Sequence, residues 1–121
     1  MTELDVQTTI RNELASEPGL MLFRANLMGV AWAGKIESQG RGMVLLSKAR
    51  PIASGLPDGF SDLFGMYRGR FVAIEVKRDS RSKPKAQQIA FLRAIHTAGG
   101  FAGVARSTDD ARRILAGELV L

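Results

Sequence analysis

Two acidic residues and a lysine in the middle of the chain have the types and spacing of a divalent-metal site. The dipeptide Arg68-Gly69 separates two apolar runs as a two-residue hairpin loop would. This register places Asp62 directly opposite Glu75, with Cβ atoms about 4.5–5.5 Å apart, and puts Lys77 on the same face. Two facing carboxylates repel each other unless a cation lies between them, and such oxygen ligands suit Mg²⁺ or Mn²⁺. The register therefore predicts that Asp62 and Glu75 bind the metal.

Asp58 competes with Asp62 as the partner of Glu75. On the hairpin register, Asp58 lies four residues beyond the facing pair, roughly 13 Å along a strand, so we interpret it as a loop residue. The backbone carbonyl of Val76, between Glu75 and Lys77, is a further candidate ligand. A one-residue slip of the hairpin would destroy the pairing. Glu75 and Lys77 would then be solvated residues of an edge strand.

Two helical stripes bring further polar residues toward this pair. One stripe belongs to the helix predicted after the polar loop, at the spacing i, i+3, i+4, i+7: Gln88, Phe91, Leu92 and Ile95. The other belongs to the first helix: Glu3, Gln7, Ile10 and Leu14. Gln88 is either a site residue or an amide satisfied by backbone, and Glu3 is either a site residue or a carboxylate stabilised by the helix dipole. Glu13 is the alternative to Glu3.

Basic residues concentrate around the predicted site. Eight of them fall between Arg68 and Arg93, against two acidic residues. The whole chain has a net charge of +5, and twelve of its seventeen basic residues are arginines, whose guanidinium groups bind phosphate oxygens in pairs. These features predict a nucleic-acid partner contacted through its phosphate backbone by the loop cations: Arg78, Arg81, Lys83 and Lys85.

Composition excludes several other chemistries. The absence of cysteine removes disulfides, thiolate zinc sites, iron–sulfur clusters and cysteine nucleophiles, and it is compatible with a reducing cytoplasm. His96 is the only histidine, so histidine triads and histidine-rich metal clusters are excluded. No apolar run reaches the roughly 20 residues that span a bilayer, and the N-terminus lacks the pattern of a signal peptide. We expect a cytoplasmic protein with no membrane partner.

The element pattern predicts a single α/β domain over residues 1–121. The expected order is αβ(β)ββαβα, a mixed sheet flanked by helices. Helices are expected from about Glu3 to Ala15 with Thr2 and Asp5 as a capping box, from Pro84 to about Ala98, and after Ser107. Residues 26–56 are expected to be the least regular part, with short strands at 30–32 and 43–46.

Three ordered segments resemble a known family. They are Gly59-Phe60-Ser61-Asp62-Leu63, the strand 71–77 ending in Glu75-Val76-Lys77, and Gln88-Ile89-Ala90-Phe91-Leu92. Together with 98–100, 103–107, Glu3 with Gln7, and Arg24-Ala25-Asn26, they resemble the virus-type replication-repair nuclease (VRR-NUC) domain of the PD-(D/E)xK nuclease superfamily. The resemblance covers nearly the whole chain, and residues 37–56 read as an irregular insertion relative to minimal members.

The resemblance implies a restriction-endonuclease-like fold and a Mg²⁺- or Mn²⁺-dependent DNA endonuclease. Asp62 and Glu75 would be metal ligands, Lys77 would orient the attacking water, Gln88 would support the site and Glu3 would reach it. Arg24 and Asn26 would contact DNA. The chain is most similar to the small stand-alone, phage-like members of the family. This similarity implies a homodimer that cuts branched DNA, such as four-way (Holliday) junctions, in repair or recombination. The alternatives from the residues are a sequence-specific restriction-type endonuclease, an RNA nuclease and a DNA-binding module without chemistry.

Overall fold

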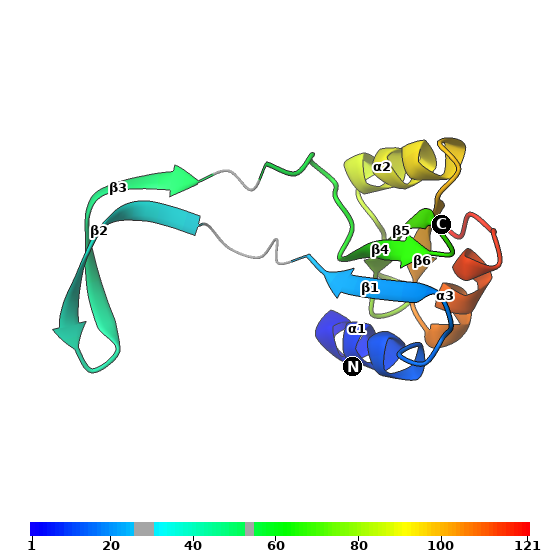
Figure 1. Ribbon diagram of the computed structural model, residues 1–121, viewed down its shortest axis with the longest axis horizontal. Coiled ribbons are helices and arrows are strands. Elements are labelled where there is room, and N and C mark those ends of the chain that lie inside the picture. The colour runs from blue at the N-terminus through cyan, green and yellow to red at the C-terminus, as the bar shows by residue number, and fades with distance from the viewer. Residues whose placement is uncertain (26–30, 53–54) are drawn as a thin grey trace. The chain divides into compact units, whose positions relative to one another are not determined.

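The computed structural model describes residues 1–25, 31–52 and 55–121, and it is a mixed α/β protein (Figure 1). The chain separates into two compact units, one of residues 1–26 and 57–121 and the other of residues 27–56. The first unit holds nearly all the elements, in chain order: α1 (Glu3–Glu13), β1 (Leu20–Arg24), β4 (Leu63–Tyr67), β5 (Arg70–Val76), α2 (Ala86–Thr97), β6 (Phe101–Ala105) and α3 (Thr108–Leu115). The second unit holds β2 (Ala31–Gly40) and β3 (Met43–Ile52).

The first unit is a four-stranded sheet with helices on both faces. Its strand order is β1-β4-β5-β6, with β6 parallel to β5 and the other pairs antiparallel. Alternate side chains of β5 enter two apolar clusters: Val72 and Ile74 pack with α1 and α3, and Ala73 packs with α2. Figure 1 shows α2 on one side of the sheet and α1 and α3 on the other. None of the described helices is long and apolar enough to cross a membrane.

The β4–β5 hairpin has the predicted register. Tyr67 pairs with Arg70 and Leu63 pairs with Ile74. The loop residues Arg68 and Gly69 have φ angles of 51° and 80°, the left-handed pair that a two-residue type I′ turn requires. The ladder between β4 and β5 ends at the Leu63–Ile74 pair, one position short of Asp62 and Glu75. Asp62 directly precedes β4, whereas Glu75 still lies within β5, where it pairs with Val104 of β6.

Helix caps hold the helices that flank this sheet edge. Thr2 and Asp5 form the predicted capping box: the backbone N of Thr2 lies 2.8 Å from Asp5 Oδ2, and the backbone N of Asp5 lies 3.1 Å from Thr2 Oγ1. Ser107 caps α3 as predicted. The helix predicted from Pro84 begins instead at Ala86, with Lys85 as its N-cap. The Lys85 N–H donates to Gln88 Oε1 at 2.8 Å, so a side chain of the helix satisfies its own cap.

The second unit corrects the expectation of an irregular segment. Its two ten-residue strands, β2 and β3, pair antiparallel over most of 31–52, so the expected short strands extend much further. The turn Gly40-Arg41-Gly42 joins them, with positive φ at all three residues. A second irregularity lies between Ala33 and Lys35, opposite Lys48. Val30, which the expected first strand included, lies outside the described residues.

Candidate active site

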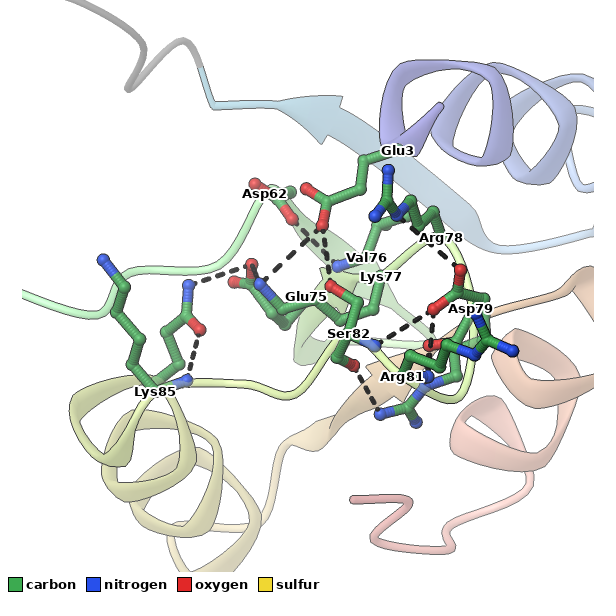
Figure 2. Close-up of polar contacts among 12 residues, drawn as sticks. Glu3, Asp62, Glu75, Val76, Lys77, Arg78, Asp79, Arg81, Ser82 and Lys85 are labelled. Atoms are coloured by element: carbon green, nitrogen blue, oxygen red, sulfur yellow. Dashed lines mark hydrogen bonds and ion pairs between the residues drawn. The ribbon is translucent and has the colours of Figure 1, made fainter. Parts of the chain in front are cut away.

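The predicted pair meets at the edge of the sheet where β5 ends. Glu75 is the penultimate residue of β5 and is 2% exposed. Asp62 precedes β4, and its Oδ2 accepts a hydrogen bond of 2.9 Å from the N–H of Val76. Figure 2 shows Asp62, Glu75 and Lys77 converging, with Glu3 approaching from α1. The hairpin register and this hydrogen bond fix the two carboxylates beside each other. Asp58, by contrast, is exposed before β4.

Burial and a like charge dominate the electrostatics of Glu75. Burial, the largest cause, and the neighbouring carboxylate of Asp62 raise the pKa of Glu75 to about 9, against a smaller lowering by Lys77. Glu3 raises that pKa slightly. The Oε2 atom of Glu75 is buried without a hydrogen-bond partner. Without an added cation, Glu75 therefore keeps its proton at neutral pH.

Lys77 and Gln88 contact the same oxygen of Glu75. Lys77 Nζ lies 3.8 Å from Glu75 Oε1, and the side chain of Lys77 is only 12% exposed. Gln88 Nε2 donates to Glu75 Oε1 at 3.1 Å, while the other end of its amide accepts from Lys85. The hydrogen bond from the backbone of Lys85 thus orients the side-chain amide of Gln88, which in turn orients the carboxyl group of Glu75. Gln88 is therefore a residue of the candidate site, and its amide is not hydrogen-bonded to backbone alone.

The structure resolves the choice between the two glutamates of α1. Glu3 Oε1 lies 4.0 Å from Lys77 Nζ and accepts a hydrogen bond of 3.3 Å from Ser82 Oγ. Glu13 is exposed at the last residue of α1. The capping box with Thr2 as N-cap makes Glu3 the first residue of α1, which places this carboxylate beside Lys77. Glu3, not Glu13, therefore reaches the site.

Sequence reasoning missed the residues that hold the polar loop over the site. Arg106 Nε donates to the carbonyl of Asp79 at 2.8 Å, and its terminal nitrogen donates to the carbonyl of Ser82 at 3.0 Å. The carboxylate of Asp79 accepts from the N–H groups of Arg81 and Ser82. Arg106 follows β6, and parallel strands end at the same edge of a sheet. That rule, applied to β5 and β6, could have identified Arg106.

The side chains present fit part of a divalent-metal site. Among the described residues, no three His, Cys, Asp or Glu side chains form a group that could hold a metal ion. Asp62 and Glu75 nevertheless supply two adjoining carboxylates, and the unpartnered Oε2 of Glu75 is the kind of atom that a cation would satisfy. A metal held here needs further oxygen ligands from backbone, water or substrate, as is usual for Mg²⁺.

The predicted DNA-contacting residues are exposed where the structure describes them. They are Arg24 at the end of β1 and the four cations of the loop, Arg78, Arg81, Lys83 and Lys85. Arg78 Nε lies 3.6 Å from Asp79, so part of its charge is balanced locally. Asn26 lies outside the described residues.

Comparisons with known proteins add no relative to this picture. The sequence matches no model of a known protein family. No curated protein is significantly similar to it. A functional assignment therefore depends on the chemistry of the residues at the sheet edge.

Gly59 sets the distance between the Asp62 segment and α2. Its φ is +80°, and a Cβ atom there would collide with the backbone of Gln87 and Gln88. We expect Gly59→Ala to lower the free energy of unfolding by about 3 kcal/mol, from backbone strain and from separation of Asp62 and Gln88. Chemical denaturation measures this change.

Gly69 provides the matched control for that substitution. It also has a φ of +80°, but among the described residues, its two chain neighbours aside, no atom lies within 4 Å of the position that its Cβ would occupy. Gly69→Ala should therefore lose only about 1 kcal/mol, the backbone contribution. Equal losses for the two variants would contradict a close contact at Gly59.

Proposed function

We propose that this protein is a divalent-metal-dependent nuclease that hydrolyses phosphodiester bonds in DNA. The observation that carries the proposal is the buried carboxyl group of Glu75, near the end of β5, with the half-buried carboxylate of Asp62 and the ammonium group of Lys77 beside it. Two carboxylates forced together in this way are unfavourable for stability alone, because one of them must hold a proton. A site for a cation explains the arrangement.

The residues that would hold Mg²⁺ or Mn²⁺ are Asp62 and Glu75, with the carbonyl of Val76 and the carboxylate of Glu3 as further candidates. A bound divalent cation polarises a phosphoryl oxygen and lowers the pKa of water. The carboxylates fit this role because they carry negative charge and hard oxygen ligands, and the chain has no cysteine to supply a thiolate instead.

The other side chains would position the reacting groups and stabilise the charge that develops on the phosphate. Lys77, largely buried between Glu75 and Glu3, places a positive charge where it can orient a water molecule or stabilise negative charge that develops on the phosphate. Gln88 holds the orientation of Glu75, and Arg106 holds the loop that carries Arg78 and Arg81. These exposed cations would bind the phosphate backbone.

The resemblance to the VRR-NUC domain supports a finer proposal. A four-stranded mixed sheet with Asp62, Glu75 and Lys77 at one edge is compatible with a restriction-endonuclease-like fold. On that basis we propose an intracellular homodimer that acts on branched DNA, with four-way junctions as the preferred substrate. Two symmetric sites would allow paired cuts across such a junction.

Cleavage of a substrate panel tests this function. Labelled linear duplex, flapped and four-way-junction DNA of the same sequences, and a matched RNA duplex, are incubated with Mg²⁺ or Mn²⁺, and with EDTA as the control. We expect cleavage only with metal, and cutting of the junction at least about tenfold faster than the linear duplex, a difference of about 1.4 kcal/mol. Tight DNA binding without cleavage in either metal would support a DNA-binding module instead.

A further inference from the structure

The unit of residues 27–56 carries most of the net charge of the protein. Its 30 residues contain four basic residues and one acidic residue, a net charge of +3. The other 91 residues contribute only +2. The chemistry proposed above uses none of these four cations: Lys35, Arg41, Lys48 and Arg50. Their concentration on one hairpin therefore needs a separate explanation.

Two of the four cations occupy unfavourable backbone conformations. Arg41, between two glycines at the turn, has a φ of 54°, and Lys48, in the irregularity of β3, has a φ of 52°. Glycine or asparagine adopts this left-handed conformation with less strain than a long side chain does. Backbone geometry alone thus disfavours arginine and lysine at both positions, so a role for their charged groups is the better explanation.

The charged groups of the hairpin are largely unbalanced. Within the part of the chain that the structure describes, Arg41, Lys48 and Arg50 make no ion pair. Only Lys35 has an acidic neighbour, with Nζ 3.9 Å from Glu37. Such cations on an exposed ribbon are an electrostatic match for a polyanion.

Exposed apolar side chains accompany the cations. Trp32, Ile36 and Val44 are 54%, 68% and 64% exposed. Alternation along β2 and the pairing of Ser38 with Val44 place all three on one face, while Lys35 and Arg50 belong to the other. A two-stranded ribbon is marginally stable by itself, so a bound partner would also stabilise this unit.

We propose that the β2–β3 hairpin is a nucleic-acid-binding arm that contacts duplex DNA through these cations. A two-stranded ribbon has the width that the major groove admits, and the cations at the turn and irregularity would bind backbone phosphates. A second copy of the same arm is a poorer partner, because two ribbons of charge +3 repel each other. The proposal shares the DNA partner of the proposed function but none of its chemistry.

The double variant Arg41→Asn/Lys48→Asn tests the arm. Asparagine tolerates left-handed φ, so the variant removes two charges while relieving backbone strain. Binding to a fluorescent 30-base-pair duplex is measured by anisotropy in EDTA over a series of salt concentrations. We expect affinity to fall at least about tenfold near 0.1 M salt, and the slope of log K against log salt to decrease by about two.

A charge-matched control separates the arm from net charge. Arg11→Gln/Arg112→Gln also removes two exposed arginines. Arg11 and Arg112 line two hollows that share Leu14, and the hollow of Arg112 includes Tyr67, at the end of β4 opposite to Asp62. We expect less than about a threefold loss of affinity for this control. A second arm variant, Lys35→Gln/Arg50→Gln, leaves Arg41 and Lys48 unchanged and so tests the arm independently of the two left-handed positions. We expect it to lower DNA affinity as well, which keeps the proposal testable if the first variant fails to fold.

The outcomes distinguish this proposal from the nuclease proposal. If DNA binding depends on the arm residues but no DNA is cleaved, the proposal of a DNA-binding arm stands and the nuclease proposal is wrong. If DNA is cleaved, but both arm variants keep the DNA affinity and the salt slope of the parent protein, the proposal of a DNA-binding arm is wrong. Light scattering tests the alternative that the arm binds a second copy of itself. If the arm variants no longer form a dimer but bind DNA with unchanged affinity, the arm is not a DNA contact.

Discussion

Glu75→Gln is expected to lower the rate of metal-dependent DNA cleavage by at least about a thousandfold, while the protein becomes more stable. Glutamine has the same shape and can still accept the hydrogen bond from Gln88 Nε2. It removes the negative charge, however, so a cation between residues 75 and 62 loses one of its two carboxylates. The variant therefore separates charge from packing.

The stability gain follows from the protonation of Glu75. Its pKa is about 9 in the folded protein against an ordinary value of 4.5, so between these values the folded state binds more protons than the unfolded state does. Stability of the metal-free protein therefore falls as pH rises through this window. Glu75→Gln removes that dependence and should raise the free energy of unfolding by about 1–3 kcal/mol near pH 8, and by much less near pH 5.

Asp58→Asn is the matched control for the acidic site. Asp58 is exposed and lies four residues before Asp62, so it shares the region but not the pairing. We expect its cleavage rate and its stability to stay within about twofold and 0.5 kcal/mol of the parent protein. Loss of activity in Asp58→Asn, with activity retained in Glu75→Gln, would contradict the assigned site.

Local rules explain how much of this site the sequence could predict. A two-residue loop fixes the register of both strands, so Arg68-Gly69 determines which residues face each other several positions away. The same logic gives the capping box at Thr2 and hence the start of the helix that carries Glu3. Asp62, Glu75, Lys77, Gln88 and Glu3 were predictable because each depends on periodicity within one hairpin or one helix.

Contacts between distant segments were not predictable in this way. Ser82 meets Glu3 across 79 positions of the chain, and Arg106 reaches the carbonyls of a loop 24 and 27 positions earlier. The extent of the β2–β3 hairpin was also missed, because its turn and irregularity place Arg41 and Lys48 at left-handed φ. Neither residue type signals such a conformation, so the alternation of the two strands was hidden.

Divalent cations are expected to stabilise the protein, and increasingly so as pH rises. A cation at Asp62 and Glu75 requires Glu75 without its proton, so binding must release the proton that burial retains. Apparent metal affinity should therefore increase with pH up to about 9, the pKa of Glu75. At a metal concentration one hundred times Kd, the free energy of unfolding should rise by about 2.7 kcal/mol.

Thermal unfolding with and without Mn²⁺ or Mg²⁺, near pH 6 and near pH 8.5, measures this coupling, and calorimetry in buffers of different ionisation enthalpy counts the released protons. The metal-induced increase in Tm should be several degrees larger at the higher pH. This trend is opposite to that of the metal-free protein, whose stability falls as pH rises. Glu75→Gln should lose both the increase and the proton release. An equal increase in Tm in that variant would place the cation elsewhere, because a ligand that stabilises the fold must bind the folded state through residues that the variant retains.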